Sequence, residues 1–410
     1  MFVLALFISI MLGAFSAQAV VTSFDECKEV FYKGTEPGGM DQNAKKICQK
    51  LENDGYYATL YSVNHGIPLY TAYLFNANCL SIAGRRENWH AEPRIPQPRS
   101  TIENIFFENY TMVCKENQAI SSNYSDTGYD RGYLYPSFQY SEEQKATFSP
   151  TNAVPMDACF NGIHWKNYEK VLRTFLLLKY SSSDLERKRM DEPDEEFSMN
   201  NIATVYIVTG TVPSANEQIP YRGTSKDPER VTVPSHIWTA VCYKDRFNDA
   251  KSFSFGYIGN NLPDGRITPM LIPDLEKRLS ELYRVVSKSP RSINIFADCF
   301  SKKTNLGEVL YFQKLINLQL SRAVQSRSDI QNMIKTVKRA LRTDTKFTDN
   351  FKVTKMTAEL AFDSMSSYRN VTEDLKRATG SSCLITYVSP QKEGMNERRK
   401  RGVSEFSDAV

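Results

Sequence analysis

The alternation of apolar and polar residues in the first part of the chain is typical of a sheet. Residues 55–75 alternate in this way and are rich in aromatic side chains, which predicts half-buried strands. Residues 203–209 are largely β-branched and are followed by Gly210, so they predict a buried strand that ends at this glycine. Another strand is expected over residues 237–243. The strands of the expected sheet are therefore far apart in the sequence.

Helical spacing appears in the middle of the chain and again towards its end. Between residues 165 and 180, apolar side chains recur at intervals of three and four. The pattern turns helical after Pro273 and stays helical from about Gly307 to Ala378. Residues 184–196 are densely charged and residues 92–100 are rich in Pro and Arg, so both are expected to be loops.

The first residues have the pattern of a targeting sequence. An apolar run over residues 2–12 precedes the small-residue site Ala17-Gln18-Ala19, which predicts a cleaved signal peptide over residues 1–19. The alternative is a membrane anchor, but the run is too short to span a bilayer. No later stretch approaches the length of a transmembrane segment. We therefore expect a secreted, extracellular or lumenal protein.

Cysteines and glycosylation motifs agree with this compartment. Eight cysteines follow the predicted signal peptide, and an even number in an oxidising compartment predicts disulfides. None of them forms a Cys-x-x-Cys pair, which argues against a zinc site. Three Asn-x-Ser/Thr motifs are candidate glycosylation sites: Asn109, Asn123 and Asn370.

Positive charge is concentrated in the last part of the chain. Residues 301–410 hold 20 Lys and Arg against 12 Asp and Glu, a net of +8, so the first 300 residues, with 31 against 35, carry −4. Residues 330–346 combine an apolar stripe with basic residues on another face: Lys335, Lys338, Arg339 and Arg342. Such a helix can contact phosphates or an anionic surface, and the alternative is a packed helix with a solvated face. Residues 391–410 predict a disordered basic tail, and Arg398–Arg401 resembles a furin-type processing site.

One short motif suggests chemistry. The segment Asp130-Arg131-Gly132-Tyr133-Leu134-Tyr135-Pro136 resembles the Asp-Arg-Gly-His signature of the DNA/RNA non-specific endonucleases, in which the His is the general base. Downstream, residues 152–155 resemble the family's Asn-x-x-Pro segment, and Asn161, Trp165 and Glu169 follow at the family's spacing. Residues 67–73, 205–210 and 233–238 resemble its core strands. The matching segments span roughly residues 24–300.

The resemblance implies an α+β fold. Residues 20–300 would form a nuclease domain of the ββα-metal (His-Me finger) kind, with a mixed or antiparallel sheet and flanking helices. Residues 301–390 would form a helical C-terminal region. The substrate would be DNA or RNA, and the cofactor would be one divalent cation, Mg²⁺ or Mn²⁺.

The resemblance also assigns roles to residues. Asn161 would bind the cation, and Glu169 would hold it through water. Arg131 would contact the scissile phosphate, and Arg173 is a second candidate. A further positive group from Arg85 or Arg86 is a looser match. Asp130 and Asn152 would support these site residues without contacting the substrate.

Most of these residues also have a simpler explanation. Asn161 could cap the helix that follows it, because Asn is favoured at that position. Arg131 could be a structural ion-pair partner, and Glu169 could be a solvated helix residue.

Tyr133 stands where the family has its catalytic His. A phenol ordinarily titrates near about pH 10, and loss of a general base costs roughly 10²–10⁴-fold in rate. Tyr135 and Met156 replace positions that are commonly Asn and Gln in the family. Three functions remain open: an impaired metal-dependent endonuclease, a pseudonuclease that binds nucleic acid or a partner, and a folded carrier for the helical region.

Overall fold

The computed structural model describes most of the chain between residues 20 and 322. The gaps in this range are residues 22, 42, 52–53, 77–88, 92–105, 108–117, 126, 137–146, 189–201, 221–230, 264, 288–291 and 301–304. Beyond residue 322 it describes residues 351–353, 358–361 and 385–388. The predicted signal peptide, residues 92–100, the basic segment 330–346, the basic tail, Arg85, Arg86, Asn109 and Asn370 lie outside the described residues.

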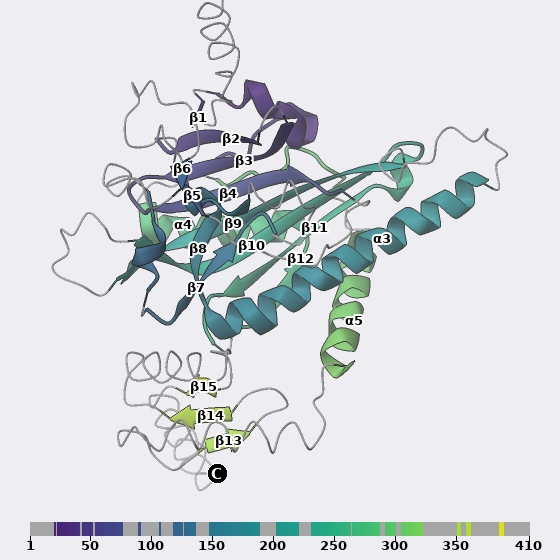
Figure 1. The fold of residues 1–410 in the computed structure, drawn as a ribbon. Coiled ribbons are helices and arrows are strands. Elements are labelled where there is room, and N and C mark those ends of the chain that lie inside the picture. Colours follow the sequence, from purple (N-terminus) through teal and green to yellow (C-terminus); the bar gives the residue numbers. More distant parts are fainter. Residues whose placement is uncertain are drawn as a thin grey trace, which may run out of the picture.

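A central antiparallel sheet of eight strands organises the domain (Figure 1). Its strand order is β1-β2-β3-β4-β9-β10-β11-β12, and every neighbouring pair is antiparallel. The strands are β1 (Val20–Val21), β2 (Lys45–Leu51), β3 (Asp54–Ser62), β4 (Ile67–Leu74), β9 (Ala203–Ile219), β10 (Val231–Asp245), β11 (Phe253–Asn260) and β12 (Ile267–Met270). The predicted α+β class and antiparallel sheet are confirmed.

Both faces of the sheet are buried, which makes a three-layer domain. Alternate residues of β9 supply the two cores, Val205 and Ile207 to one and Val208 and Val212 to the other. The first core lies under α3 (Lys166–Lys188) and α5 (Leu306–Arg322). The second lies under α4 (Ile272–Ser287) and the 3₁₀ helix η1 (Asp25–Val30). Figure 1 shows α3 crossing in front of the sheet with α5 beside it.

Two of the predicted element ends are wrong. Strand β9 continues through Gly210 to Ile219. A side chain at position 210 would collide with the Trp238 ring on β10, which explains the glycine at this position. The glycine therefore makes room for a neighbouring strand instead of ending its own. Helix α3 continues to Lys188, into the charged segment that was expected to be a loop.

The C-terminal part is helical at first, as expected. Helix α4 follows Leu271, and α5 begins at Leu306. A small sheet of β13 (Phe351–Val353), β14 (Ala358–Ala361) and β15 (Ile385–Val388) then occurs where the pattern predicts helix. These strands have only three or four residues, so their alternation of apolar and polar residues is too short to be distinguished from a helical pattern. Among the described helices, none combines the length and apolarity needed to cross a membrane.

Disulfides are present, as the cysteine content predicts. Cys27 is bonded to Cys48 and Cys242 to Cys299, with Cα–Cα distances of 5.8 and 6.0 Å. Cys159 is also disulfide-bonded. The second bond ties β10 to the segment that follows α4. The remaining cysteines, Cys79, Cys114 and Cys383, lie outside the described residues.

One predicted glycosylation site is not presented by the folded chain. Asn123 is 4% exposed, and its side-chain oxygen accepts a hydrogen bond from the Ile120 amide at 2.8 Å. A glycan on this amide would require a solvent-facing side chain. The structure therefore argues against Asn123 as an acceptor.

Candidate active site

A strand pair and a helix form a ββα unit beside the central sheet. Strand β7 (Tyr129–Tyr133) pairs antiparallel with β8 (Ala153–Asp157). The chain then passes through the π-helical turn η7 (Phe160–Trp165) directly into α3. The Asp130–Pro136 motif thus lies mainly on the first strand, and Asn161 and Glu169 lie on the helical part, as a ββα finger requires.

Two buried polar side chains hold the finger in place. Asn261 accepts a hydrogen bond from the Asp157 amide at 2.8 Å and donates to the carbonyls of Pro155 and Pro234, each at 2.9 Å. These bonds join β8 to β10. The Asp157 carboxylate in turn accepts from the amides of Cys159 and Phe160 at 2.9 and 3.1 Å.

The capping group of this helix is therefore Asp157, and the capping alternative for Asn161 is wrong. Sequence analysis missed both Asp157 and Asn261. An Asp directly before a helical pattern is a recognisable capping signal, so Asp157 could have been found. No local pattern marks Asn261, because its partners come from two other strands.

The structure brings Asn161 and Asp130 together. The Asn161 amide nitrogen donates to the Asp130 carboxylate at 3.3 Å. Only the nitrogen of an amide can donate to a carboxylate, so this contact fixes the amide orientation and leaves Oδ1 as its other end. An amide oxygen on a half-buried side chain is a suitable ligand for a hard divalent cation.

The described residues contain no cluster of three or more His, Cys, Asp or Glu side chains that could hold a metal. A cation here would therefore have a sparse protein shell completed by water. Mg²⁺ tolerates such a shell because it normally keeps several of its own waters. The residues present fit this kind of site.

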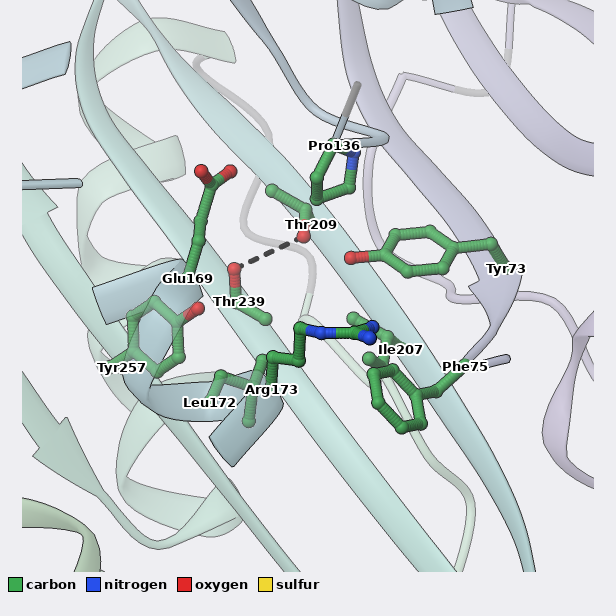
Figure 2. A pocket seen from close by; sticks show the side chains of 10 residues that line it. All are labelled: Tyr73, Phe75, Pro136, Glu169, Leu172, Arg173, Ile207, Thr209, Thr239 and Tyr257. Atoms are coloured by element: carbon green, nitrogen blue, oxygen red, sulfur yellow. Dashed lines mark hydrogen bonds between the residues drawn. The ribbon is translucent and has the colours of Figure 1, made fainter. Parts of the chain in front are cut away.

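Glu169 and Arg173 line a small hollow between α3 and the sheet (Figure 2). Its floor includes Thr209 and Thr239, whose hydroxyls are hydrogen-bonded at 3.1 Å. Pro136, the last residue of the Asp130–Pro136 motif, also lines the hollow, so the motif and α3 border the same space. Figure 2 shows the Glu169 carboxylate and the Arg173 guanidinium directed to different sides of it.

The environment of Glu169 favours its protonated form. Burial raises the pKa of this carboxyl to about 8, and the Trp165 indole and the charge of Lys166 oppose the rise only in part. Glu169 is half-buried and lines the hollow, so it is not a freely solvated helix residue.

Tyr133 belongs to an aromatic cluster. Its ring stacks on Trp89 with centroids 5.8 Å apart and an interplanar angle of 16°. It also meets the ring of Phe148 edge-on at 5.8 Å. At the position of the family's base, this chain thus places a packed, half-buried phenol.

Arg131 contacts the same cluster. Its guanidinium carbon lies 4.0 Å from the centre of the Trp89 ring, and Nη1 donates to the Ser121 hydroxyl at 2.5 Å. None of the carboxylates that the structure describes forms an ion pair with it. The ion-pair alternative for Arg131 is thus not observed. Sequence analysis missed Trp89 and Ser121, which are not adjacent to the motif.

Other residues of the motif are structural. Tyr135 is 2% exposed and packs on Tyr57 and Tyr73, with ring centroids 4.9 and 4.6 Å away. Met156 is fully buried against Gly132. These two side chains fill core space at positions where the family commonly has amides.

Asn152 supports the loop after β7. Its side chain bonds the backbone nitrogen of Tyr135 at 2.8 Å and the carbonyls of Tyr135 and Thr147 at 3.1 Å. The nearest histidine in the sequence, His164, has its Nε2 3.1 Å from the Pro263 carbonyl.

Comparisons with known proteins agree with this geometry. The family described as DNA/RNA non-specific endonuclease matches residues 38–267. The human Endonuclease domain-containing 1 protein is 31% identical over 261 residues, which cover 62% of this chain and 46% of the human protein. The mouse protein of the same name is 30% identical over the same coverage. A protein named Nuclease from a Nostoc strain is 26% identical over 205 residues, 48% of this chain and 57% of that protein.

The chain spans about half the length of the mammalian relatives it matches. A solved structure described as the EndoG/EndoGI complex covers 63% of this chain and 91% of its own at 16% identity, with a TM-score of 0.37, which is too low to support an argument. The match over residues 38–267 covers more than half of the chain and contains the whole ββα unit. This chain belongs to the DNA/RNA non-specific endonuclease family.

Proposed function

We propose that this chain is a secreted, metal-dependent nuclease-like protein that binds DNA or RNA and hydrolyses its phosphodiester bonds slowly. The observation that carries the proposal is the packing of Tyr133 between Trp89 and Phe148, at the position of the family's general base. A phenol with an ordinary pKa near about 10 is a poor proton acceptor at neutral pH. Water activation is the step that this replacement slows.

The remaining residues retain the groups that the reaction needs. Asn161 would hold Mg²⁺ or Mn²⁺ through its amide oxygen, with Glu169 acting through a water molecule. When bound, the cation would supply Lewis-acid stabilisation of charge on the leaving oxygen. Asp130 orients the Asn161 amide. Arg131 binds the scissile phosphate, and Arg173 supplies a second positive charge from the hollow below α3.

Two observations support a secretory compartment. The described disulfides form readily only where the environment is oxidising. The first nineteen residues have the pattern of a signal peptide. Asn109 and Asn370 remain candidate glycosylation sites in that compartment.

A second function, a pseudonuclease that binds nucleic acid or a protein partner without cleaving, is favoured by one further observation. Tyr135 and Met156 are both core residues here, so the site differs from the family pattern at more than its base. In that case restoring the base alone would not restore hydrolysis.

Plasmid digestion with Mg²⁺ separates the two functions. Tyr133→His should raise cleavage at neutral pH by about 10²-fold, because a general base contributes that much or more. Tyr133→Phe is the matched control and should cleave no faster than the natural chain. Asn161→Ala added to Tyr133→His should abolish the gain, because the restored base would act without the cation.

Two results would contradict the main proposal. If Tyr133→His remains inert while calorimetry shows that Mg²⁺ still binds, the pseudonuclease function replaces it. If the natural chain cleaves rapidly and Tyr133→Phe is equally fast, another residue is the base.

A further inference from the structure

The guanidinium of Arg131 is held on two sides. Its carbon lies over the Trp89 ring, 4.0 Å from the ring centre, and Ser121 accepts from Nη1 at 2.5 Å. A guanidinium is a rigid plane with five N–H donors. The ring contact and the hydrogen bond together restrict the position of the guanidinium, and among the described residues its other N–H groups have no further hydrogen-bond acceptor.

The two partners of Arg131 are themselves immobilised. Trp89 is 8% exposed and packs against Phe148 and the ring of Tyr133. Its indole N–H has no hydrogen-bond partner among the described residues. The position of the ring is therefore explained by its packing and not by a hydrogen bond from the indole. Ser121 begins the 3₁₀ turn η5 (Ser121–Asn123), which the Asn123 side chain closes onto the Ile120 amide.

We propose that Trp89 and Ser121 are positioning residues that hold the Arg131 guanidinium in place for a phosphate of DNA or RNA; this rests on the proposed function. A planar fork of N–H donors matches a phosphate in two places at once. Arg131 is half-buried, and no described carboxylate neutralises it. A guanidinium fixed in advance loses less side-chain freedom on binding, which increases affinity.

This role is separate from the role of Tyr133 in hydrolysis. Trp89 contacts the side chain of Arg131 and the side chain of Tyr133. Phosphate binding through Arg131 needs neither proton transfer nor a cation. It should therefore persist in the natural chain when divalent cations are removed.

The test is fluorescence anisotropy of a short fluorescein-labelled single-stranded oligodeoxynucleotide, in EDTA and at several salt concentrations. Arg131→Ala should weaken binding about tenfold and reduce the salt dependence by about one phosphate contact. Trp89→Leu should weaken it about fivefold, while Trp89→Phe, which keeps a ring, should recover most of the loss. Phe24→Leu is the matched control, because Phe24 is a similarly buried ring in the core on the other face of the sheet, and it should leave affinity unchanged.

A double-mutant cycle separates positioning from general structure. Trp89→Leu should have no further effect on affinity in a chain that already carries Arg131→Ala. If it weakens binding equally in both chains, Trp89 acts only through the fold and the inference is overturned. If Trp89→Leu does not fold, as judged by near-UV circular dichroism, Ser121→Ala takes its place in the same cycle, with an expected loss of about threefold.

The same measurements separate this inference from the proposed function. If Arg131→Ala leaves affinity unchanged, the phosphate contact is absent and this inference fails, while the proposed hydrolysis is still judged by the cleavage assay. If Arg131→Ala weakens binding but neither Trp89 nor Ser121 couples to it, only the positioning roles fail. The effect of Tyr133→His on cleavage is measured independently of either result.

Discussion

His236 is expected to make the free energy of unfolding depend on pH. The side chain lies on β10, half-buried, with Nδ1 3.0 Å from the Ser235 hydroxyl. Burial, and then the positive charge of Arg278, lower the pKa of this imidazole from 6.5 to about 4, and a hydrogen bond with Asn260 opposes them only in part. The folded chain therefore favours the neutral imidazole, and the unfolded chain takes up a proton at higher pH.

The sign and size of the effect follow from these values. The stabilisation is fully present above pH 6.5, and it is lost as pH falls from 6.5 towards about 4. At about 1.4 kcal/mol for each tenfold difference, the whole pKa difference corresponds to about 3.4 kcal/mol. Because the ring is only half-buried, we expect about 2 kcal/mol of the free energy of unfolding to be lost over this range.

Urea unfolding of the natural chain and of His236→Gln at pH 7.5, 5.5 and 4.5 measures this contribution. Acid-sensitive carboxylates act equally on both proteins, so the difference between the two pH profiles isolates His236. The natural chain should lose about 2 kcal/mol more than His236→Gln. Arg278→Met should lose less than the natural chain, because removal of a nearby positive charge raises the imidazole pKa. Parallel profiles for the natural chain and His236→Gln would refute the reasoning.

Three further experiments test the packing of the domain. Asn261→Ala leaves buried backbone groups of β8 and β10 unpaired and should cost about 3 kcal/mol in urea unfolding; a loss below about 1 kcal/mol would mean that the finger is held elsewhere. Gly132→Ala would press against Met156 and should cost about 1–3 kcal/mol, most of it recovered by Met156→Ala in the same chain; thermal unfolding without such recovery would contradict this contact. Lys179 and Glu308 form an ion pair at 2.5 Å, and each side chain is about a quarter exposed. A double-mutant cycle should show a coupling of about 1 kcal/mol between them. Additive effects on the free energy of unfolding would exclude a role of this pair in docking α5 on α3.

The local sequence carried enough information for the elements and for most of the candidate site. Strands within residues 55–75 and a helix after Pro273 were predicted from periodicity, and β3, β4 and α4 lie there. The prediction that these strands are half-buried is wrong for β4, which is buried along almost its whole length. Asp130, Asn161 and Glu169 were identified by their order and spacing. The structure places them on the strand and helix of one ββα unit, as the spacing implies.

Several predictions failed where neighbours from elsewhere in the chain decided the outcome. Gly210 looked like the end of a strand, yet it accommodates Trp238 from the adjacent strand. Asn161 looked like a helix cap, but Asp157 is the capping residue. Asn123 fits a glycosylation motif, although the fold buries its side chain.

The sequence by itself indicated the family and the types of most elements, and it predicted Tyr133 at the position of the family's base, because these depend on residue identity and short-range spacing. Only the tertiary structure decided what surrounds them. Trp89 meets Arg131, and Asn261 meets Asp157 at a separation of 104 residues. Such contacts are set by the order of strands in the sheet, in which β4 lies beside β9 although more than a hundred residues separate them in the chain. Periodicity reports which face of an element is apolar, but it carries no information about which distant element will cover that face.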